Sequence, residues 1–447
     1  MSKSANGGMD AMLRNKRVLI ASLTGTSVEF YDFYIYATAA SLVFGPLFFA
    51  AAPPATQLMF SYASLALAFL ARPLGAAVFG HYGDRIGRKS TLVFSLMLMG
   101  GCTLAIAFLP TYQTIGWWAP LILCILRFGQ GFGLGGEWGG AALLAVENAP
   151  PGWRGRFGMF PQLGAPVGFI AANGLFLLLG ALLTEEQFIA WGWRLPFLAS
   201  SILVGLGLWI RLKLTETPEF SAALAEAPPP HLPIADLLRD HLRPAIAGTF
   251  AVVACFAIFY IATAFALGYG TTTLKIDREV FLGIQLGAIL FMAAGIILSG
   301  WWSDIYTPRG VLIAGCLGTI PMGAIFGIAM GGGSLLMIFL ILALALFLMG
   351  LVYGPLGAFL PALFPTQLRY TGASFGFNLG GIIGGALAPI VAQQLVQMKL
   401  GGYVGLYMSL AAVISLAALW RPGGPRHGTG LQSGDDGHDA ARAGSIL

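Results

Sequence analysis

The sequence predicts an all-α polytopic membrane protein with twelve transmembrane helices in two six-helix halves. Of its 447 residues, 57% are hydrophobic and only 10% are charged, whereas a soluble domain is about a quarter charged. Twelve apolar runs are each long enough to cross a bilayer, which takes about 20 residues. The longest connection, 214–243, lies between the sixth and seventh runs and contains Pro228-Pro229-Pro230. Lipid must therefore solvate much of the surface, and the chain divides near its middle.

The expected helices follow one another through short connections. They cover 18–47, 56–80, 91–109, 118–146, 156–182, 194–213, 244–270, 280–300, 310–330, 335–360, 371–396 and 402–420. The first, fourth and tenth are long enough to tilt or bend. The expected divisions are an N-terminal segment (1–17), a first half (18–213), a linker (214–243), a second half (244–420) and a disordered tail (421–447).

The distribution of Lys and Arg predicts the orientation, because cytoplasmic loops are enriched in these residues. Most of the 24 fall in the N-terminal segment, the even-numbered connections and the tail, whereas only Arg194, Lys275, Arg278 and Lys399 fall in the opposite connections. Both termini are therefore expected to be cytoplasmic.

Several classes of function are excluded. The net charge of +5 comes from short clusters between apolar runs, so no nucleic acid is expected as a partner. The histidines and cysteines show no metal-ligand spacing, and no cofactor is expected. Residues 131–136 fit the pattern G-x-G-x-x-G, but they lie within an apolar run, where glycines four apart favour helix packing. The protein is therefore not expected to be an enzyme.

Five charged residues lie inside the spans and away from the span ends, all in the first half. They are Glu29, Asp32, Arg72, Arg127 and Glu137. Because a charge in hydrocarbon is costly, each is a candidate functional residue with a partner. Asp32 and Arg127 lie near the middle of their helices, at about 1.5 Å per residue, and an acid facing an arginine can exchange a proton for a charged solute. Proton coupling is therefore assigned to Asp32, Glu29, Arg127 and Glu137. For Arg72 and Glu137, a static ion pair that holds their helices together is an equal alternative.

Polar residues in the spans are the candidates for solute binding. We assign this role to Arg127, Tyr36, Gln130, Gln162, Tyr353 and Asn378. The second half has no charge inside its spans, so shape recognition of the solute is expected there. Each residue taken alone can also be explained as an interhelical hydrogen bond.

The strongest local motif is a glycine-rich charged turn after the second run. It contributes Gly80, Gly83, Asp84, Arg85, Gly87, Arg88 and Lys89 to a predicted conformational latch, together with Arg72 and with Asp304 of a weaker second copy. In that copy Gly300 and Asp304 are retained, whereas Ile305-Tyr306-Thr307-Pro308 replaces the Arg and Gly positions. A purely topological role for the basic turn is the alternative.

These motifs resemble those of the metabolite:proton symporter family of the major facilitator superfamily. The turn matches its G-x-x-x-D-R-x-G-R-[RK] signature, and six further motifs occur in order. They are Gly25–Tyr36, Ala71–Gly75, Arg127–Gly140, Phe160–Pro166, Trp193–Phe197 with Glu216–Phe220, and Phe364–Ser374. The resemblance covers about 17–420.

The resemblance implies the major facilitator fold and proton-coupled uptake of a small organic acid across a bacterial inner membrane. Substrates of that family include shikimate, dicarboxylates, citrate, and proline or betaine. The expected partners are the metabolite, protons and membrane lipid, and the chain is expected to be a monomer. Proton-independent facilitation or exchange and zwitterion symport are the alternatives; a solute sensor is disfavoured, because only 27 residues follow Trp420.

Overall fold

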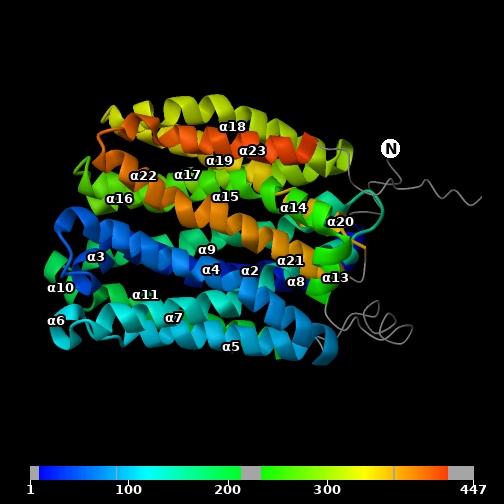
Figure 1. Ribbon diagram of the computed structural model, residues 1–447, viewed down its shortest axis with the longest axis horizontal. Coiled ribbons are helices and arrows are strands. Elements are labelled where there is room, and N and C mark those ends of the chain that lie inside the picture. Colours follow the sequence, from blue (N-terminus) through cyan, green and yellow to red (C-terminus); the bar gives the residue numbers. More distant parts are fainter. Residues whose placement is uncertain (1–9, 87, 213–232, 366–367, 421–447) are drawn as a thin grey trace, which may run out of the picture.

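The computed structural model describes residues 10–86, 88–212, 233–365 and 368–420, and the helices in these ranges run along one common direction (Figure 1). Those of the first half are α2 (Lys16–Leu42), α3 (Phe44–Phe48), α4 (Pro54–Ile86), α5 (Arg88–Ala107), α6 (Tyr112–Ile115), α7 (Trp118–Leu134), α8 (Glu137–Glu147), α9 (Arg154–Leu182), α10 (Glu185–Ala190) and α11 (Leu195–Leu212).

The helices of the second half follow the linker. They are α13 (Pro233–Asp240), α14 (Leu242–Ala251), α15 (Val253–Tyr260), the π-helical turn η2 (Ile261–Phe265), α16 (Ala266–Thr272), α17 (Arg278–Ile305), α18 (Pro308–Gly331), α19 (Leu335–Tyr353), α20 (Leu356–Ala362), α21 (Arg369–Gly381), the π-helical turn η4 (Ile382–Ala386), α22 (Leu387–Gln397) and α23 (Val404–Trp420). The short helix α13 lies within the expected linker, 214–243.

The described helices account for all twelve expected spans. Ten helical stretches there are long and apolar enough to cross a membrane. The other two are α2, which carries two acidic side chains, and α5, whose apolar part Val93–Ala107 is shorter. The predicted all-α, twelve-helix membrane fold is confirmed.

Several predicted boundaries are wrong. The expected turn at residues 80–89 is mostly helical, because α4 continues to Ile86 and α5 begins at Arg88. The first span is interrupted at Val43, the fourth at Gly135-Gly136 and the tenth at Gly354-Pro355. The seventh and eleventh each contain a π-helical turn, in which one residue is added to the helical repeat.

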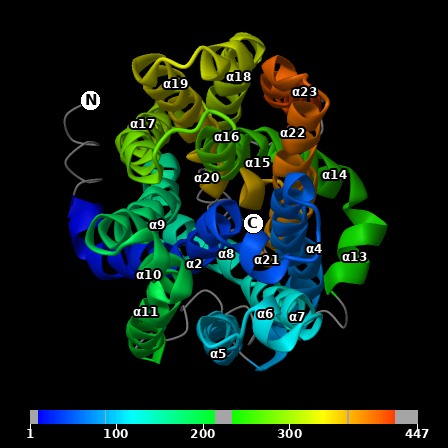
Figure 2. The same ribbon diagram turned by 90° about the vertical axis from the view of Figure 1, so that its left-hand side faces the viewer.

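The two halves lie side by side (Figures 1 and 2). Between them α9 packs against α17, and α4 packs against α21 and η4. The helices α3, α6 and α10 lie at the left end of the bundle in Figure 1, here called the α10 end, and α13 lies at the other, the α13 end. The centre, where α2 lies, is the place for a site shared by both halves (Figure 2).

Glycines bring α7 and α4 into backbone contact. A Cβ at Gly131 would lie 2.3 Å from the carbonyl oxygen of Ala68, and one at Gly135 would lie 2.1 Å from that of Arg72. Both distances are far below van der Waals contact, so no larger residue fits without moving the backbone. This contact positions Arg127 of α7 and Arg72 of α4 in the centre of the first half.

Candidate functional site

Arg127 is a fully buried charge in the bundle centre. Its side chain is 0% exposed, and its guanidinium carbon lies 4.3 Å and 4.0 Å from the ring centroids of Phe33 and Tyr36. These rings lie one turn apart on α2, and the Tyr36 hydroxyl bonds to Ser64 of α4 at 2.8 Å. Aromatic faces attract a cation, and the attraction is stronger where water is excluded. The predicted site residue Tyr36 therefore contacts Arg127 through the face of its ring.

The guanidinium of Arg127 is only partly hydrogen-bonded. Its Nη1 donates to Oε1 of Gln130 at 2.5 Å, whereas Nε and Nη2 have no hydrogen-bond partner among the described residues. A buried charged donor without a hydrogen-bond partner costs free energy. An acceptor bound at this edge of the guanidinium would therefore be stabilised. The Nε and Nη2 N–H groups are parallel and match the two oxygens of a carboxylate.

Asp32 is also 0% exposed, and two hydroxyl groups bind its carboxylate. Ser200 of α11 donates to Oδ1 at 2.5 Å, and Thr103 of α5 donates to Oδ2 at 3.1 Å. Arg127 and Asp32 interact electrostatically, but the described ion pairs do not include this one. The two are joined instead through Gln130, whose Nε2 donates to Thr103 at 2.6 Å. The expectation that the acid faces the arginine directly is therefore corrected to an indirect connection.

Arg72 approaches the same aromatic ring as Arg127. Its guanidinium carbon lies 4.4 Å from the Phe33 centroid and 4.8 Å from that of Phe69, and its Nε has no hydrogen-bond partner in the described part of the chain. Glu29 interacts with it electrostatically. The sequence groups Arg72 with the predicted latch, whereas in the structure its side chain lies in the bundle centre, beside the ring that Arg127 also contacts.

Glu137 lies at the first turn of α8 and is 2% exposed. It accepts a hydrogen bond from Ser95 of α5 at 2.7 Å, and it interacts electrostatically with Asp32. The ion pairs of the described residues do not include one between Arg72 and Glu137, the static pair that was the alternative for them.

Three predicted solute-binding residues lie where the halves meet. Gln162 accepts from the indole of Trp138 at 3.1 Å and donates to the carbonyl oxygen of Tyr353 at 2.9 Å. Asn378 donates to the carbonyl oxygen of Gly135 at 2.8 Å. Trp138 stacks on Phe377, with centroids 3.9 Å apart. These polar groups therefore join the two halves, while the Tyr353 hydroxyl has no hydrogen-bond partner among the described residues.

At the α13 end, Asp304 of α17 ties the second half to the first. Its carboxylate accepts from the backbone N–H groups of Gly155 at 2.6 Å and Arg156 at 3.1 Å, in the first turn of α9, and lies 3.3 Å from Arg156 Nε. An anion at a helix N-terminus is favoured by unpaired N–H groups and by the helix dipole. A Cβ at Gly155 would meet the Gly300 carbonyl oxygen at 2.5 Å, so both glycines permit this close approach.

The predicted latch is therefore described in part. Asp304 makes contacts between the halves, as a latch residue must. The remaining latch residues, Gly80, Gly83, Asp84, Arg85, Gly87, Arg88 and Lys89, lie outside the residues whose surroundings the structure describes.

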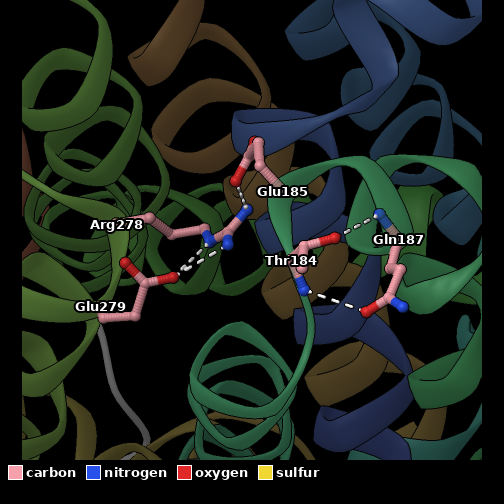
Figure 3. Close-up of polar contacts among 5 residues, drawn as sticks. All are labelled: Thr184, Glu185, Gln187, Arg278 and Glu279. Carbon is pink, nitrogen blue, oxygen red and sulfur yellow. Dashed lines mark hydrogen bonds and ion pairs between the residues drawn. The ribbon is translucent and has the colours of Figure 1, made fainter.

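At the α10 end the halves are tied by Arg278, at the start of α17 (Figure 3). Its Nη1 lies 3.0 Å from the Glu185 carboxylate of α10, its Nη2 lies 2.8 Å from Glu279, and its guanidinium packs 3.9 Å from the Phe188 centroid. Thr184 and Gln187 form a capping box that starts α10 and fixes Glu185 in place (Figure 3). Contacts between the halves thus exist at both ends.

Replacing Asp304 by Asn is expected to loosen the α13 end, because it removes the anion from the N-terminus of α9. The loss of a helix cap typically costs about 1 kcal/mol or somewhat more. This corresponds to roughly a tenfold larger population of the conformation in which the α13 end is open. A cysteine introduced at the buried position Ala358 of α20 (Ala358→Cys) would be alkylated faster when this end opens more often, and the alkylation rate is the measurement. Asp240→Asn, an exposed acid at the same end, should leave the rate unchanged; equal rates in both variants would contradict the role of Asp304.

Sequence reasoning missed Thr103 and Ser200, which bind the Asp32 carboxylate. Each is a hydroxyl residue in an apolar run, and Ser200 is followed by a second serine, Ser201; such residues are common in membrane helices. No signal in the sequence separates them from their neighbours, because their role depends on which helices meet in space.

Comparison with known proteins agrees with this architecture. The family model described as sugar (and other) transporter matches residues 17–226. The chain is 47% identical to the inner membrane metabolite transport protein YhjE of Escherichia coli, over 93% of this chain and 95% of that protein. The chain belongs to the major facilitator superfamily. It is also 35% identical to the Escherichia coli shikimate transporter, over 93% of this chain and 96% of that one.

This major facilitator has the fold of solved sugar carriers. The xylose transporter XylE of Escherichia coli, in a partially occluded inward-open conformation, matches with a TM-score of 0.71 at 16% identity, over 90% of this chain and 96% of that one. The resemblance on which the family was inferred is therefore confirmed. The chain is a multi-pass membrane protein that transports metabolites, and not an enzyme.

Proposed function

We propose that this transporter takes up a small organic acid together with a proton, by alternating exposure of a site between its two halves. The observation that carries the proposal is Arg127, a buried guanidinium whose Nε–Nη2 edge has no acceptor among the described residues and which is linked through hydrogen bonds to a buried carboxyl group. A carboxylate is the acceptor that fits this edge, since two parallel charge-assisted hydrogen bonds form at once.

Proton coupling follows from the charges around that edge. When Asp32 is ionised, it partly compensates the charge of Arg127 and weakens the attraction for an anion. When Asp32 is protonated, Arg127 is less compensated and binds the anion more strongly. Proton and anion therefore favour each other's binding, which is the thermodynamic condition for symport.

The shikimate transporter among the relatives supports an acidic substrate. The proline/betaine transporter of Salmonella typhimurium is 30% identical over 91% of this chain. Because a zwitterion also carries a carboxylate, a zwitterion is the second candidate substrate. We further propose a monomer in a bacterial inner membrane, with the α13 end and both termini cytoplasmic, the halves at 18–213 and 244–420 being joined by the linker at 214–243.

Uptake by proteoliposomes tests the proposal. Radiolabelled shikimate, succinate and glycine betaine are supplied at an outside pH one unit below the inside pH, with and without a protonophore. One proton per substrate can drive roughly tenfold accumulation of the acid across one pH unit. Uptake of the acids that is indifferent to the gradient would indicate a facilitator, and accumulation of betaine alone would indicate the zwitterion symporter.

A further inference from the structure

Thr103 of α5 occupies the junction between the proton-binding and the anion-binding groups. It is 0% exposed, and three polar atoms lie within hydrogen-bond distance of its hydroxyl oxygen. They are Oδ2 of Asp32 at 3.1 Å, Nε2 of Gln130 at 2.6 Å and the carbonyl oxygen of Met99 at 3.0 Å. Thr103 therefore contacts Asp32 directly and Arg127 through one intervening side chain.

The direction of each hydrogen bond follows from the chemistry of Arg127. A guanidinium has donors only, so the group of Gln130 that faces it must be the amide oxygen. The Gln130 amide nitrogen then faces Thr103 and donates to it. The hydroxyl of Thr103 thus always accepts from Gln130, and its single proton is left to choose between Asp32 and Met99.

The protonation state of Asp32 decides that choice. An ionised carboxylate can only accept, so Thr103 donates its proton to Asp32. A carboxyl protonated at Oδ2 donates to Thr103, whose own proton then turns to the Met99 carbonyl oxygen. No heavy atom moves and no hydrogen bond is lost. On the other side, Ser200 has only Asp32 Oδ1 as a hydrogen-bond partner among the described residues, so Oδ2 is the favoured position for the proton.

We propose that Thr103 is a positioning residue that transmits the protonation state of Asp32 through Gln130 to Arg127, and so sets how strongly substrate affinity depends on pH. This deepens the proposed function and rests on it. When Thr103 donates to the ionised Asp32, its oxygen becomes a better acceptor for Gln130, and Gln130 in turn holds Arg127 more firmly, because hydrogen bonds in a chain polarise one another. Protonation reverses the first bond and releases the guanidinium toward an anion.

Other charges act on the same carboxyl group. Arg127 of α7 and Glu137 of α8 interact with Asp32 electrostatically, as does Tyr31 of its own helix. None of these contacts Thr103 by a hydrogen bond in the described residues. A variant of Thr103 therefore changes the connection and leaves the surrounding charges in place.

The test compares three variants by the KM of acid uptake between pH 5.5 and 8.5. Thr103→Val has nearly the same shape but no hydroxyl, Thr103→Ser retains the hydroxyl, and Ser200→Ala removes the other hydroxyl that binds Asp32. In the wild type, KM rises as Asp32 ionises. Thr103→Val should reduce this rise by about fivefold or more, in the range of a typical coupling between sites. Thr103→Ser should retain it.

Ser200→Ala is the matched control, because it removes a donor to Asp32 without cutting the path to Gln130. It should move the midpoint of the KM profile to more alkaline pH, by about one unit, while the size of the rise is kept. Equal profiles for Thr103→Val and Ser200→Ala, or an unchanged rise in Thr103→Val, would overturn the proposal. Should Thr103→Val not fold, Gln130→Met cuts the next link and should flatten the rise in the same way.

Failure of this inference and failure of the proposed function are distinguishable. If the wild type shows no gradient-driven accumulation, symport is wrong. If the wild type is gradient-driven and the Thr103 variants follow its KM profile, symport stands and the connection through Thr103 is wrong.

Discussion

Replacing Asp32 by Asn is expected to abolish proton-driven accumulation of the substrate while leaving substrate exchange intact. The amide resembles the protonated carboxyl group in shape and lack of charge. It still accepts one hydroxyl hydrogen bond, and its NH₂ group can donate to Thr103, whose proton then turns to the carbonyl oxygen of Met99. The fold should therefore tolerate the change, although a proton can no longer bind or leave.

Two measurements on proteoliposomes check this. Under a gradient of one pH unit, accumulation should fall from roughly tenfold to no accumulation, whereas counterflow of labelled against unlabelled acid should continue. Glu29→Gln and Glu137→Gln, which neutralise the other two buried acids, are the matched controls. Unchanged accumulation in Asp32→Asn would transfer the coupling role to one of those two residues.

The membrane fold was predictable because its signals are local. An apolar run of about 20 residues and a charge within such a run are both visible in the sequence. This is why the twelve spans and the residues Asp32, Arg72 and Arg127 could be found. The lengths of the first and fourth runs predict a tilt or a bend, but nothing in the sequence marks Val43 or Gly135-Gly136 as the place where the helix is interrupted.

The connections within the site were less predictable because they depend on how helices meet. Spacing along α7 shows that Arg127 and Gln130 share a face, but not that Thr103 of α5 and Asp32 of α2 complete the chain. For the same reason a direct pair of Asp32 with Arg127 was expected. The indirect arrangement explains why the described residues provide no hydrogen-bond acceptor for Nε and Nη2 of Arg127, although a carboxylate lies nearby.

Replacing Arg127 by Lys is expected to raise the KM for an acidic substrate by at least about 30-fold, with a smaller change in exchange at saturating substrate. Lysine keeps the charge, but its ammonium group cannot present two parallel N–H groups to a carboxylate. It also loses the planar contact with the rings of Phe33 and Tyr36 and the hydrogen bond to Gln130. The loss of a buried charge-assisted pair typically costs about 2–5 kcal/mol, which is the origin of the expected factor.

The measurement is the KM of acid uptake at acidic pH, where Asp32 is protonated. Under this condition the wild type and Arg127→Lys differ only in the side chain at position 127. Arg194→Lys is the matched control, since that guanidinium binds the carbonyl oxygens of Ala107 and Leu109 at a helix junction away from Asp32. Its KM should remain within about twofold of the wild type, as for substitutions away from a binding site. An equal KM in Arg127→Lys and the wild type would show that the substrate carboxylate binds elsewhere, with Arg72, the other buried guanidinium beside Phe33, as the next residue to replace.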